Sequence, residues 1–215
     1  MDAALIVVGA VLLAFLQFRY RRQQQFRFIS EFRFNPNLRD KILLHYPHLN
    51  DDQIDHVFAA LKDYFWMCLK ANKEFVTMPS RVVDKAWHEF ILYTKSYQKF
   101  CHSAFGRYLH HTPADVLSNK STSQEGIQRA WALACAKHSF DPKTSHQLPL
   151  IFVIDKMLAI PNGFHYQTLS MLSSNSHNMT TVHPVSMTEK VDCEDSDTMD
   201  DANNCGNCGN NCGSH

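Results

Sequence analysis

Residues 78–113 read MPSRVVDKAWHEFILYTKSYQKFCHSAFGRYLHHTP, and this stretch combines a clear helical pattern with four histidines. Apolar side chains recur every three or four residues from Val83 to Ala104, which is the spacing of one helix face. Ser80 precedes this pattern and has the side chain of a good helix N-cap. The stretch therefore predicts one long helix that starts after Ser80 and breaks near Gly106.

Helical signals also flank this stretch on both sides. The segments show apolar repeats of three and four, and they begin or end at Pro, Asn, Ser or Asp residues that favour helix boundaries. No segment shows the alternation of a strand, so we expect an all-α fold with a compact multi-helix bundle in residues 25–172. The further predicted helical segments are residues 35–46, 50–71, 122–137 and 148–160.

Residues 3–16, AALIVVGAVLLAFL, form an unbroken apolar run. The run is shorter than the 20 or so residues of a usual membrane span, and it also has the length of a signal-peptide core. Asp2 precedes it without a Lys or Arg, and no small-x-small cleavage site follows it. We predict a single membrane anchor in residues 1–24, with a signal peptide and a buried core helix as the alternatives.

The arginines that follow the apolar run predict its direction. Arg19, Arg21 and Arg22 come directly after it, and basic residues stay on the cytoplasmic side of a membrane. The membrane is thus an expected partner of a single-pass protein whose body is cytoplasmic. The whole chain has 21 basic and 21 acidic residues, and this balance gives no reason to expect nucleic acid as a partner.

The composition turns to Ser, Asn, Thr, Asp and Gly near the C-terminus, and we expect a disordered tail in residues 173–215. The tail ends in CGNCGNNCGSH, whose Cys205, Cys208, Cys212 and His215 have the number and type of zinc ligands. Ordering so short a polar segment costs entropy that only the metal could offset. A disordered tail with incidental metal affinity and a dedicated metal or redox site both stay open, whereas disulfides fit a reducing cytoplasm least.

Asp84 and His88 are four residues apart, so they share one face of the predicted helix. A carboxylate one turn away can hold an imidazole in one tautomer, as it does behind metal-bound and catalytic histidines. The same pair also suits a half-buried polar contact between two helices. His110 and His111 can reach His88 only if the chain turns back after Gly106; otherwise they cap helix carbonyls or pair with acids.

The remaining reactive residues give weaker signals. Cys68, Cys101 and Cys135 stand singly on apolar helix faces, where free cysteine behaves as a small hydrophobic residue. The sequence contains no G-x-S-x-G, phosphate-loop or dinucleotide pattern. His88-Glu89 begins like a zinc-protease motif, but Leu92 stands where its second histidine belongs. No catalytic motif is complete, and this favours a binding protein over an enzyme.

The order of the polar and aromatic residues in 78–113 resembles the glycine-rich-domain-containing protein family and its small bacterial relatives. Phe90 stands where plant members usually have a further histidine, and the glycine-rich feature is reduced to the short Cys-Gly-Asn tail. The resemblance implies a helical domain without a settled activity. The residues that carry it are Val83-Asp84, Trp87-His88, Tyr97, Cys101, Gly106 and His110-His111.

Two functions follow from these observations. The first is a membrane-anchored binding or interaction module with a protein partner and metal binding, for which zinc is the candidate. The second is a metal-dependent enzyme that uses Asp84, His88 and one of His110 and His111. Trp87 completes the set of candidate functional residues. Histidine nitrogens gathered around a common point would support a metal site, because zinc–nitrogen bonds are about 2.0–2.1 Å long.

Overall fold

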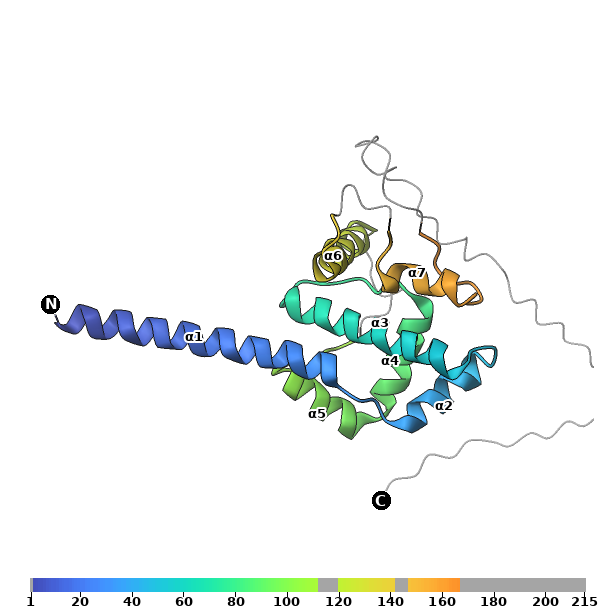
Figure 1. Cartoon of the computed structure of the whole chain (residues 1–215), viewed down its shortest axis with the longest axis horizontal. Helices are drawn as coiled ribbons and strands as arrows, with labels where there is room; N and C mark the ends of the chain where they lie inside the picture. The colour runs from blue at the N-terminus through green and yellow to red at the C-terminus, as the bar shows by residue number, and fades with distance from the viewer. Residues whose placement is uncertain (1, 112–119, 142–146, 167–215) are drawn as a thin grey trace, which may run out of the picture. The chain divides into compact units, whose positions relative to one another are not determined.

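The computed structural model describes residues 2–111, 120–141 and 147–166 of the chain. Within these ranges the chain forms seven helices and no strand, so the predicted all-α class is confirmed (Figure 1). The predicted tail, residues 173–215 with its four candidate zinc ligands, lies outside the described residues. The helices are α1 (Asp2–Glu31), α2 (Pro36–His45), α3 (Asp51–Lys70), α4 (Arg81–Leu92), α5 (Thr94–Phe105), α6 (Lys120–His138) and α7 (Leu150–Met157).

Helix α1 has an exposed N-terminal part and a packed C-terminal part. Residues 4–21 are all exposed, and the helix is long and apolar enough to cross a membrane, with a mean hydropathy of 1.6 in its most apolar window. An anchor and a signal sequence both have these properties. The helix continues without a break beyond residue 24, and Phe26, Phe28 and Ile29 pack on the hydrophobic core.

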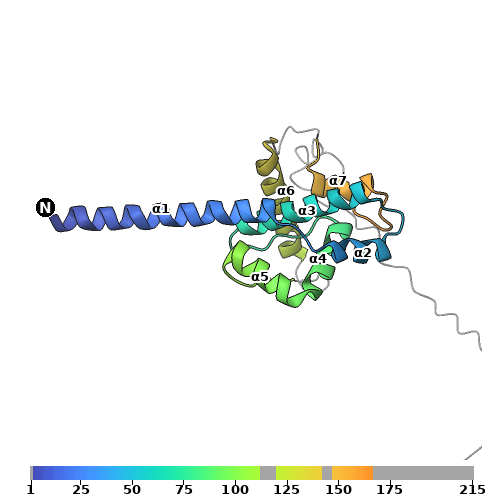
Figure 2. The same ribbon diagram turned by 60° about the horizontal axis from the view of Figure 1, so that its bottom comes forward.

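Helices α2 and α3 begin where their caps predict. The Asn35 side chain accepts a hydrogen bond from the Asn37 amide before Pro36 opens α2. Asn50 and Gln53 form a capping box at the start of α3, each side chain bonding the other residue's backbone amide. Helix α3 runs through the middle of the bundle and contacts α1, α4, α6 and α7 (Figure 2).

The single long helix predicted after Ser80 is wrong, because the structure has two helices there. Helix α4 ends at Leu92, Tyr93 leaves helical geometry with φ −79° and ψ 60°, and α5 begins at Thr94. The break brings the Tyr97 hydroxyl to 3.1 Å from the Trp87 indole nitrogen. These residues would be about 15 Å apart along a straight helix. The apolar repeat continues through the break because both helices pack on the same core, and so it did not reveal the bend.

The N-terminus of α4 is fixed by a buried carboxylate from α7. Asp155 is 2% exposed, and its oxygens accept hydrogen bonds from the Ser80 hydroxyl at 2.7 Å and the Arg81 amide at 2.8 Å. The amides of Val82 and Phe164 donate to the same carboxylate at 3.2 and 2.9 Å. A negative charge is favourable at a helix N-terminus, where the first amides lack partners within the helix. Asp155 thereby sets the position of α4, which carries the candidate site.

Candidate metal centre

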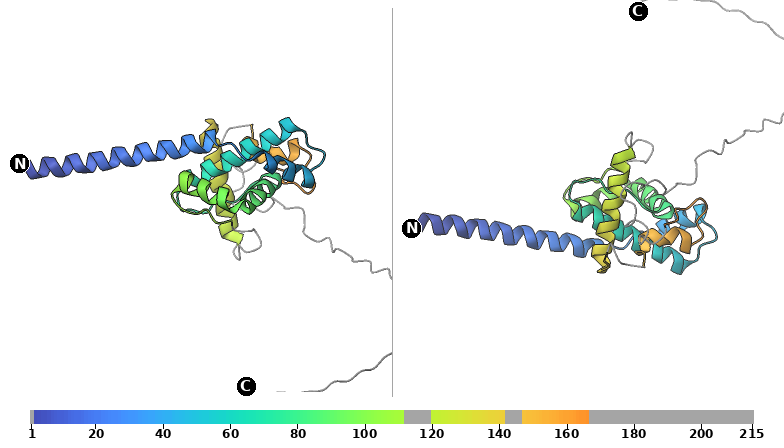
Figure 3. Two further views of the ribbon diagram at one scale, coloured as in Figure 1. Left: turned by 90° about the horizontal axis from the view of Figure 1, so that it is seen from below. Right: turned by 90° about the horizontal axis from the view of Figure 1, so that it is seen from above.

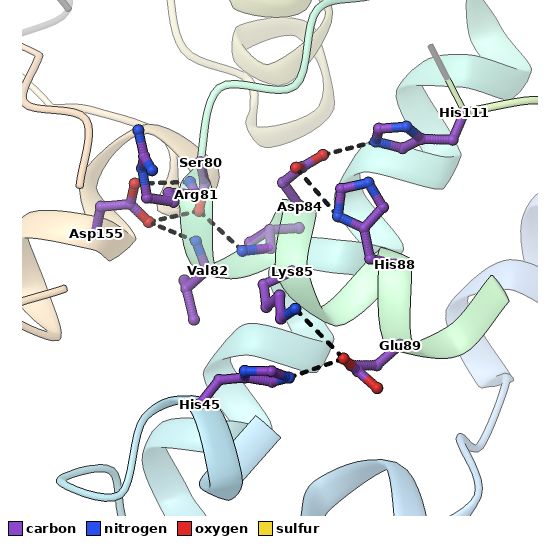
Figure 4. A network of polar contacts seen from close by, with 11 residues as sticks. His45, Ser80, Arg81, Val82, Asp84, Lys85, His88, Glu89, His111 and Asp155 are labelled. Carbon is purple, nitrogen blue, oxygen red and sulfur yellow. Dashed lines mark hydrogen bonds and ion pairs between the residues drawn. The ribbon is translucent and has the colours of Figure 1, made fainter. Parts of the chain in front are cut away.

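Asp84, His88 and His111 converge on one side of α4 (Figure 4). Asp84 and His88 lie one helical turn apart, whereas His111 comes from the segment that follows α5. The His111 Nε2 atom is 2.8 Å from Asp84 Oδ1, and the His88 Nδ1 atom is 3.5 Å from Asp84 Oδ2. The two imidazole ring centroids are 4.1 Å apart. One potential ligand atom from each residue lies within 4.8 Å of the other two.

The segment of residues 106–111, called the return loop here, carries His111 back to α4. Gly106 ends α5 in the left-handed region at φ +66°, a conformation that glycine adopts without the strain of a side chain. The buried Tyr97 hydroxyl then donates to the Leu109 carbonyl at 2.6 Å and accepts from Trp87 Nε1 at 3.1 Å. The return loop is therefore tied to both α4 and α5 before it reaches His111.

Trp87 and His110 have roles different from those of the three converging residues. The Trp87 ring packs edge-on against the His111 ring, with 4.5 Å between centroids, and its indole nitrogen belongs to the hydrogen bonds that hold the return loop. His110 is exposed and lies beside Tyr108, at a centroid distance of 4.8 Å. The structure thus brings His111, and not His110, to Asp84 and His88.

The centre is sheltered on one side and open on the other. The His111 side chain is 11% exposed, whereas the side chains of Asp84 and His88 are 33% and 42% exposed. Partial burial lowers the pKa of His88; the nearby Asp84 carboxylate opposes this shift, and His111 adds to it. A lowered pKa keeps His88 neutral at neutral pH, and the neutral imidazole is the form that binds a metal ion.

Two imidazoles and one carboxylate form a ligand set that zinc and non-haem iron both accept. Zinc bonds of about 2.0–2.1 Å place tetrahedral ligand atoms roughly 3.4 Å apart. To hold the ion, the ligand atoms would shift by roughly 1 Å, and the 2.8 Å contact between Asp84 and His111 would open slightly. The carboxylate and the two histidines would fill three positions and leave one for water. In the metal-free geometry the same atoms form a hydrogen-bonded clasp between α4 and the return loop.

A second polar cluster lies farther along α4 and joins it to α2. Glu89 contacts His45 Nε2 at 2.8 Å and the Lys85 ammonium at 3.5 Å (Figure 4). This cluster has one histidine and one acid. The Lys85 ammonium already balances the negative charge of Glu89, which a metal ion would need as its counter-charge. In the ranges that the structure describes, the Asp84 group is the one set of three His, Cys or acidic residues spaced for a metal ion.

The three described cysteines are buried and free, as the sequence predicted. Burial raises the pKa of Cys68 to about 12 and that of Cys135 to about 11, and it also raises the pKa of Cys101. These thiols therefore stay protonated at neutral pH, whereas a metal ligand must be a thiolate. They belong to the core and leave the centre to Asp84 and the two histidines.

Sequence reasoning found the members of this centre but missed the groups that position it. The spacing of Asp84 and His88 and the turn signal at Gly106 were sufficient to name the candidates. Asp155 was overlooked, although it is a lone acid in the apolar segment LIFVIDKML, and such an acid needs buried donors. The link from Trp87 through Tyr97 to the return loop could not be seen under the assumption of one straight helix.

Comparison with known proteins identifies the family of this chain. No curated protein and no solved structure matches the chain. A family model described as UCP032817-like matches residues 24–187, which is most of the 215-residue chain. The match includes α2 to α7 and all three residues of the candidate metal centre. By this match, the chain belongs to the UCP032817-like family, an uncharacterised domain family.

Proposed function

We propose that this protein is a membrane-anchored helical domain that binds a divalent metal ion through Asp84, His88 and His111. The observation that carries the proposal is the gathering of three ligand atoms within 4.8 Å of one another. A buried set of hydrogen bonds holds the return loop at this point, and supporting contacts of this kind are typical behind metal ligands.

Zinc is the ion that this ligand set favours. Imidazole nitrogen and carboxylate oxygen are both common zinc ligands, and zinc has no strict geometric requirement that a flexible, half-exposed side chain such as His88 would violate. The tail residues Cys205, Cys208, Cys212 and His215 are proposed as a second, separate zinc-binding segment. The two sites differ in chemistry, because the tail offers thiolates and the centre offers none.

The membrane anchor is proposed from α1. Its residues 4–21 are exposed in the folded domain, so the apolar run up to Leu16, about four helical turns long, would otherwise face water. Arg19, Arg21 and Arg22 follow the apolar run and favour a cytoplasmic body by the positive-inside rule. Intact-mass measurement of the mature protein tests the signal-peptide alternative, because a cleaved signal would remove the apolar run of residues 3–16.

A relation between this family and the glycine-rich-domain-containing proteins is also proposed. Six of the residues that carry the resemblance serve one structural unit in this chain. Asp84, His88 and His111 form the centre, Trp87 and Tyr97 hold the return loop, and Gly106 starts it. A motif whose members act together in the fold is less easily matched by chance than scattered residues are, and this supports the relation.

We favour a binding or interaction module, with a protein partner, over an enzyme. No complete catalytic motif occurs in the sequence, and a metal held between α4 and the return loop would fix a surface that a partner could recognise. The second candidate is a metal-dependent enzyme. It is favoured by the exposed side of the centre, because a metal with three protein ligands can hold and activate a water molecule.

Metal analysis of the full chain tests the proposal. The chain is purified in detergent with Cys205, Cys208 and Cys212 replaced by serine, so that bound metal reports the centre alone. We expect about one equivalent of zinc, in line with the single group of three ligands. His88→Ala and His111→Ala should each lose it, whereas the matched control His110→Ala should keep it.

A chain that folds fully and binds no zinc, iron or other divalent ion would overturn the metal proposal and leave the hydrogen-bonded clasp. Loss of metal from His110→Ala as readily as from His111→Ala would overturn the assignment of His111 as a metal ligand. Hydrolysis of simple ester or phosphoester substrates by the loaded chain, lost in His88→Ala, would decide for the enzyme over the binding module.

A further inference from the structure

The C-terminal ends of α3 and α5 lie beside α1 just beyond its apolar run (Figures 1 and 3). The Arg22 guanidinium donates a hydrogen bond to the Leu69 carbonyl in the last turn of α3. At the end of α5, a side-chain carbon added to Gly106 would lie 4.0 Å from the Gln25 amide nitrogen. The Arg107 guanidinium bonds the Asn72 carbonyl at 2.7 Å and so joins the two helix ends.

This arrangement places the two helix ends at the outer boundary of the lipid headgroups if α1 spans the membrane, within reach of long Arg and Lys side chains. Arg22 is six residues beyond Leu16, which is about 9 Å along a helix. The headgroup region on each side of a bilayer is about 5–8 Å thick. Because α1 is continuous from Asp2 to Glu31, no flexible linker separates the span from the packed part of the domain.

The exposed surface around α1 at this level is strongly basic. Glu74, which follows Lys73 directly in the sequence, is the acid nearest to these cations in the chain. Its carboxylate is already paired with the Arg129 guanidinium at 2.7 Å. The cations are exposed apart from Arg22, which is partly buried against α3. We call them the basic rim: Arg19, Arg21, Arg22, Lys70, Lys73 and Arg107.

An open hollow of about 430 Å³ lies between α1 and α5 at the same level. Its lining offers hydrogen-bond donors from Arg21, Gln24, Gln25 and Ser103, with the Phe28 ring as the apolar part. A cation beside neutral donors and an aromatic surface suits a phosphate group attached to a hydrocarbon portion. The hollow and the basic rim thus lie next to each other and both suit a phosphate group.

We propose that the basic rim and this hollow bind the headgroups of anionic phospholipids, so that the helical domain rests on the membrane surface. This inference rests on the proposed membrane anchor and adds a lipid class to it. The cytoplasmic leaflet carries the anionic lipids that attract basic segments next to a span. Anchor and surface contact together fix the orientation of the domain, which neither does alone.

Hydrogen exchange of the full chain in nanodiscs tests the inference. One set of discs contains phosphatidylcholine alone, and the other contains phosphatidylcholine mixed with phosphatidylglycerol. We expect amides in residues 70–73 and 103–107 to exchange several-fold more slowly in the anionic discs. High salt should abolish the difference, because the contact is electrostatic and exposed.

Charge-matched variants assign the effect to the basic rim. Lys70→Gln, Lys73→Gln and Arg107→Gln together should remove the slower exchange. The control combines Lys41→Gln, Lys95→Gln and Lys156→Gln, which removes the same charge from exposed positions on α2, the start of α5 and α7. The control should retain the slower exchange in anionic discs.

Equal exchange in the two kinds of disc, with the chain resistant to alkaline extraction from membranes, would overturn the lipid inference and leave the anchor intact. Release of the chain by alkaline extraction would overturn the anchor and with it this inference. Equal protection by inorganic phosphate in phosphatidylcholine discs would show a small-anion site and overturn the choice of lipid.

Discussion

Two carboxylates at the N-terminal end of α4, Asp155 from α7 and Asp84 in the first turn of α4, are satisfied in different ways. Asp155 is buried and accepts four hydrogen bonds, three of them from backbone amides that cannot leave. Asp84 is 33% exposed at its side chain and contacts two imidazoles, one at 2.8 Å and one at 3.5 Å. Each imidazole can rotate, change its protonation or exchange its partner for a metal ion.

The difference separates a structural acid from a candidate functional one. A carboxylate whose lone pairs are all used by fixed donors in a dry site has no capacity left for a ligand. A partly exposed carboxylate held by two histidines keeps that capacity, because each contact can be replaced by a bond to the same ion. Removing Asp155 should therefore cost stability, and removing Asp84 should cost binding.

The largest effect is expected from Asp155→Ala. The substitution leaves the Ser80 hydroxyl and the first amides of α4 without an acceptor in a buried site, and we expect a loss of about 3–5 kcal/mol in the free energy of unfolding. Denaturant unfolding of the detergent-solubilised chain measures it. Asp155→Asn, which keeps one acceptor oxygen, should lose less and serves if the alanine variant does not fold.

Asp40→Ala is the control for that measurement, because Asp40 is exposed on α2 and surface substitutions usually change stability by less than about 0.5 kcal/mol. A loss below about 1 kcal/mol for Asp155→Ala would contradict the structural role, since buried unsatisfied donors cost more than that.

Tyr97→Phe should affect both stability and binding. It removes the partner of the Trp87 indole and of the Leu109 carbonyl, which we expect to cost about 1–3 kcal/mol. Because the return loop then loosens, zinc affinity should fall by about tenfold or more, although Tyr97 is no ligand. Competition with a chromophoric chelator measures the affinity, and the exposed Tyr108→Phe is the control. Unchanged zinc affinity in Tyr97→Phe would show that the Tyr97 hydrogen bonds to the return loop do not support metal binding.

Asp84→Asn should have the opposite effect to Asp155→Ala: it should remove bound zinc and leave stability almost unchanged. We expect loss of the bound zinc with a change of about 1 kcal/mol or less in the free energy of unfolding, because the contacts are partly exposed. Metal analysis and denaturant unfolding of the same sample provide both numbers. A variant that retains its zinc would remove Asp84 from the ligand set, and a loss of stability as large as that of Asp155→Ala would erase the contrast between the two acids.

The smallest effect is the pH dependence of the metal-free chain. Since the pKa of His88 lies below its ordinary value of 6.5 in the folded state, the unfolded chain takes up the proton first as the pH falls. The contribution of His88 to stability is therefore complete above pH 6.5 and is lost as the pH decreases through the lowered pKa. Unfolding titrations with a chelator present should show a weaker loss in His88→Gln. If the free energy of unfolding falls equally with decreasing pH in the wild-type chain and in His88→Gln, the pH dependence belongs to other groups.

Local signals in the sequence predicted most of the fold. Asn35, Asn50 and Ser80 each cap the helix that follows, because capping depends on residues three or fewer positions apart. The class of the fold followed from periodicity alone. The break at Tyr93 was missed because the repeat of apolar residues reports burial. Phe90 of α4 and Phe100 of α5 both pack on Phe65 of α3, so the repeat continues across the break.

The candidate site was predicted in part. Asp84 and His88 are neighbours on any helix, so their pairing follows from their spacing of four. The choice between His110 and His111 has no local cause, since both residues follow the same turn. It depends on the Tyr97 hydroxyl, which fixes Leu109 on the buried side and so directs His111 inward and leaves His110 exposed.

The sequence by itself determined the helical class, the helix caps, the apolar N-terminal run with its arginines, and the Asp84–His88 pair. Each of these depends on residues within a few positions of one another, where backbone geometry fixes the contact. Only the tertiary structure decided that α4 and α5 bend at Tyr93, that Asp155 caps α4, and that His111 completes the centre. These depend on contacts between distant segments, and those contacts form because buried donors and acceptors must find partners wherever the packed core places them.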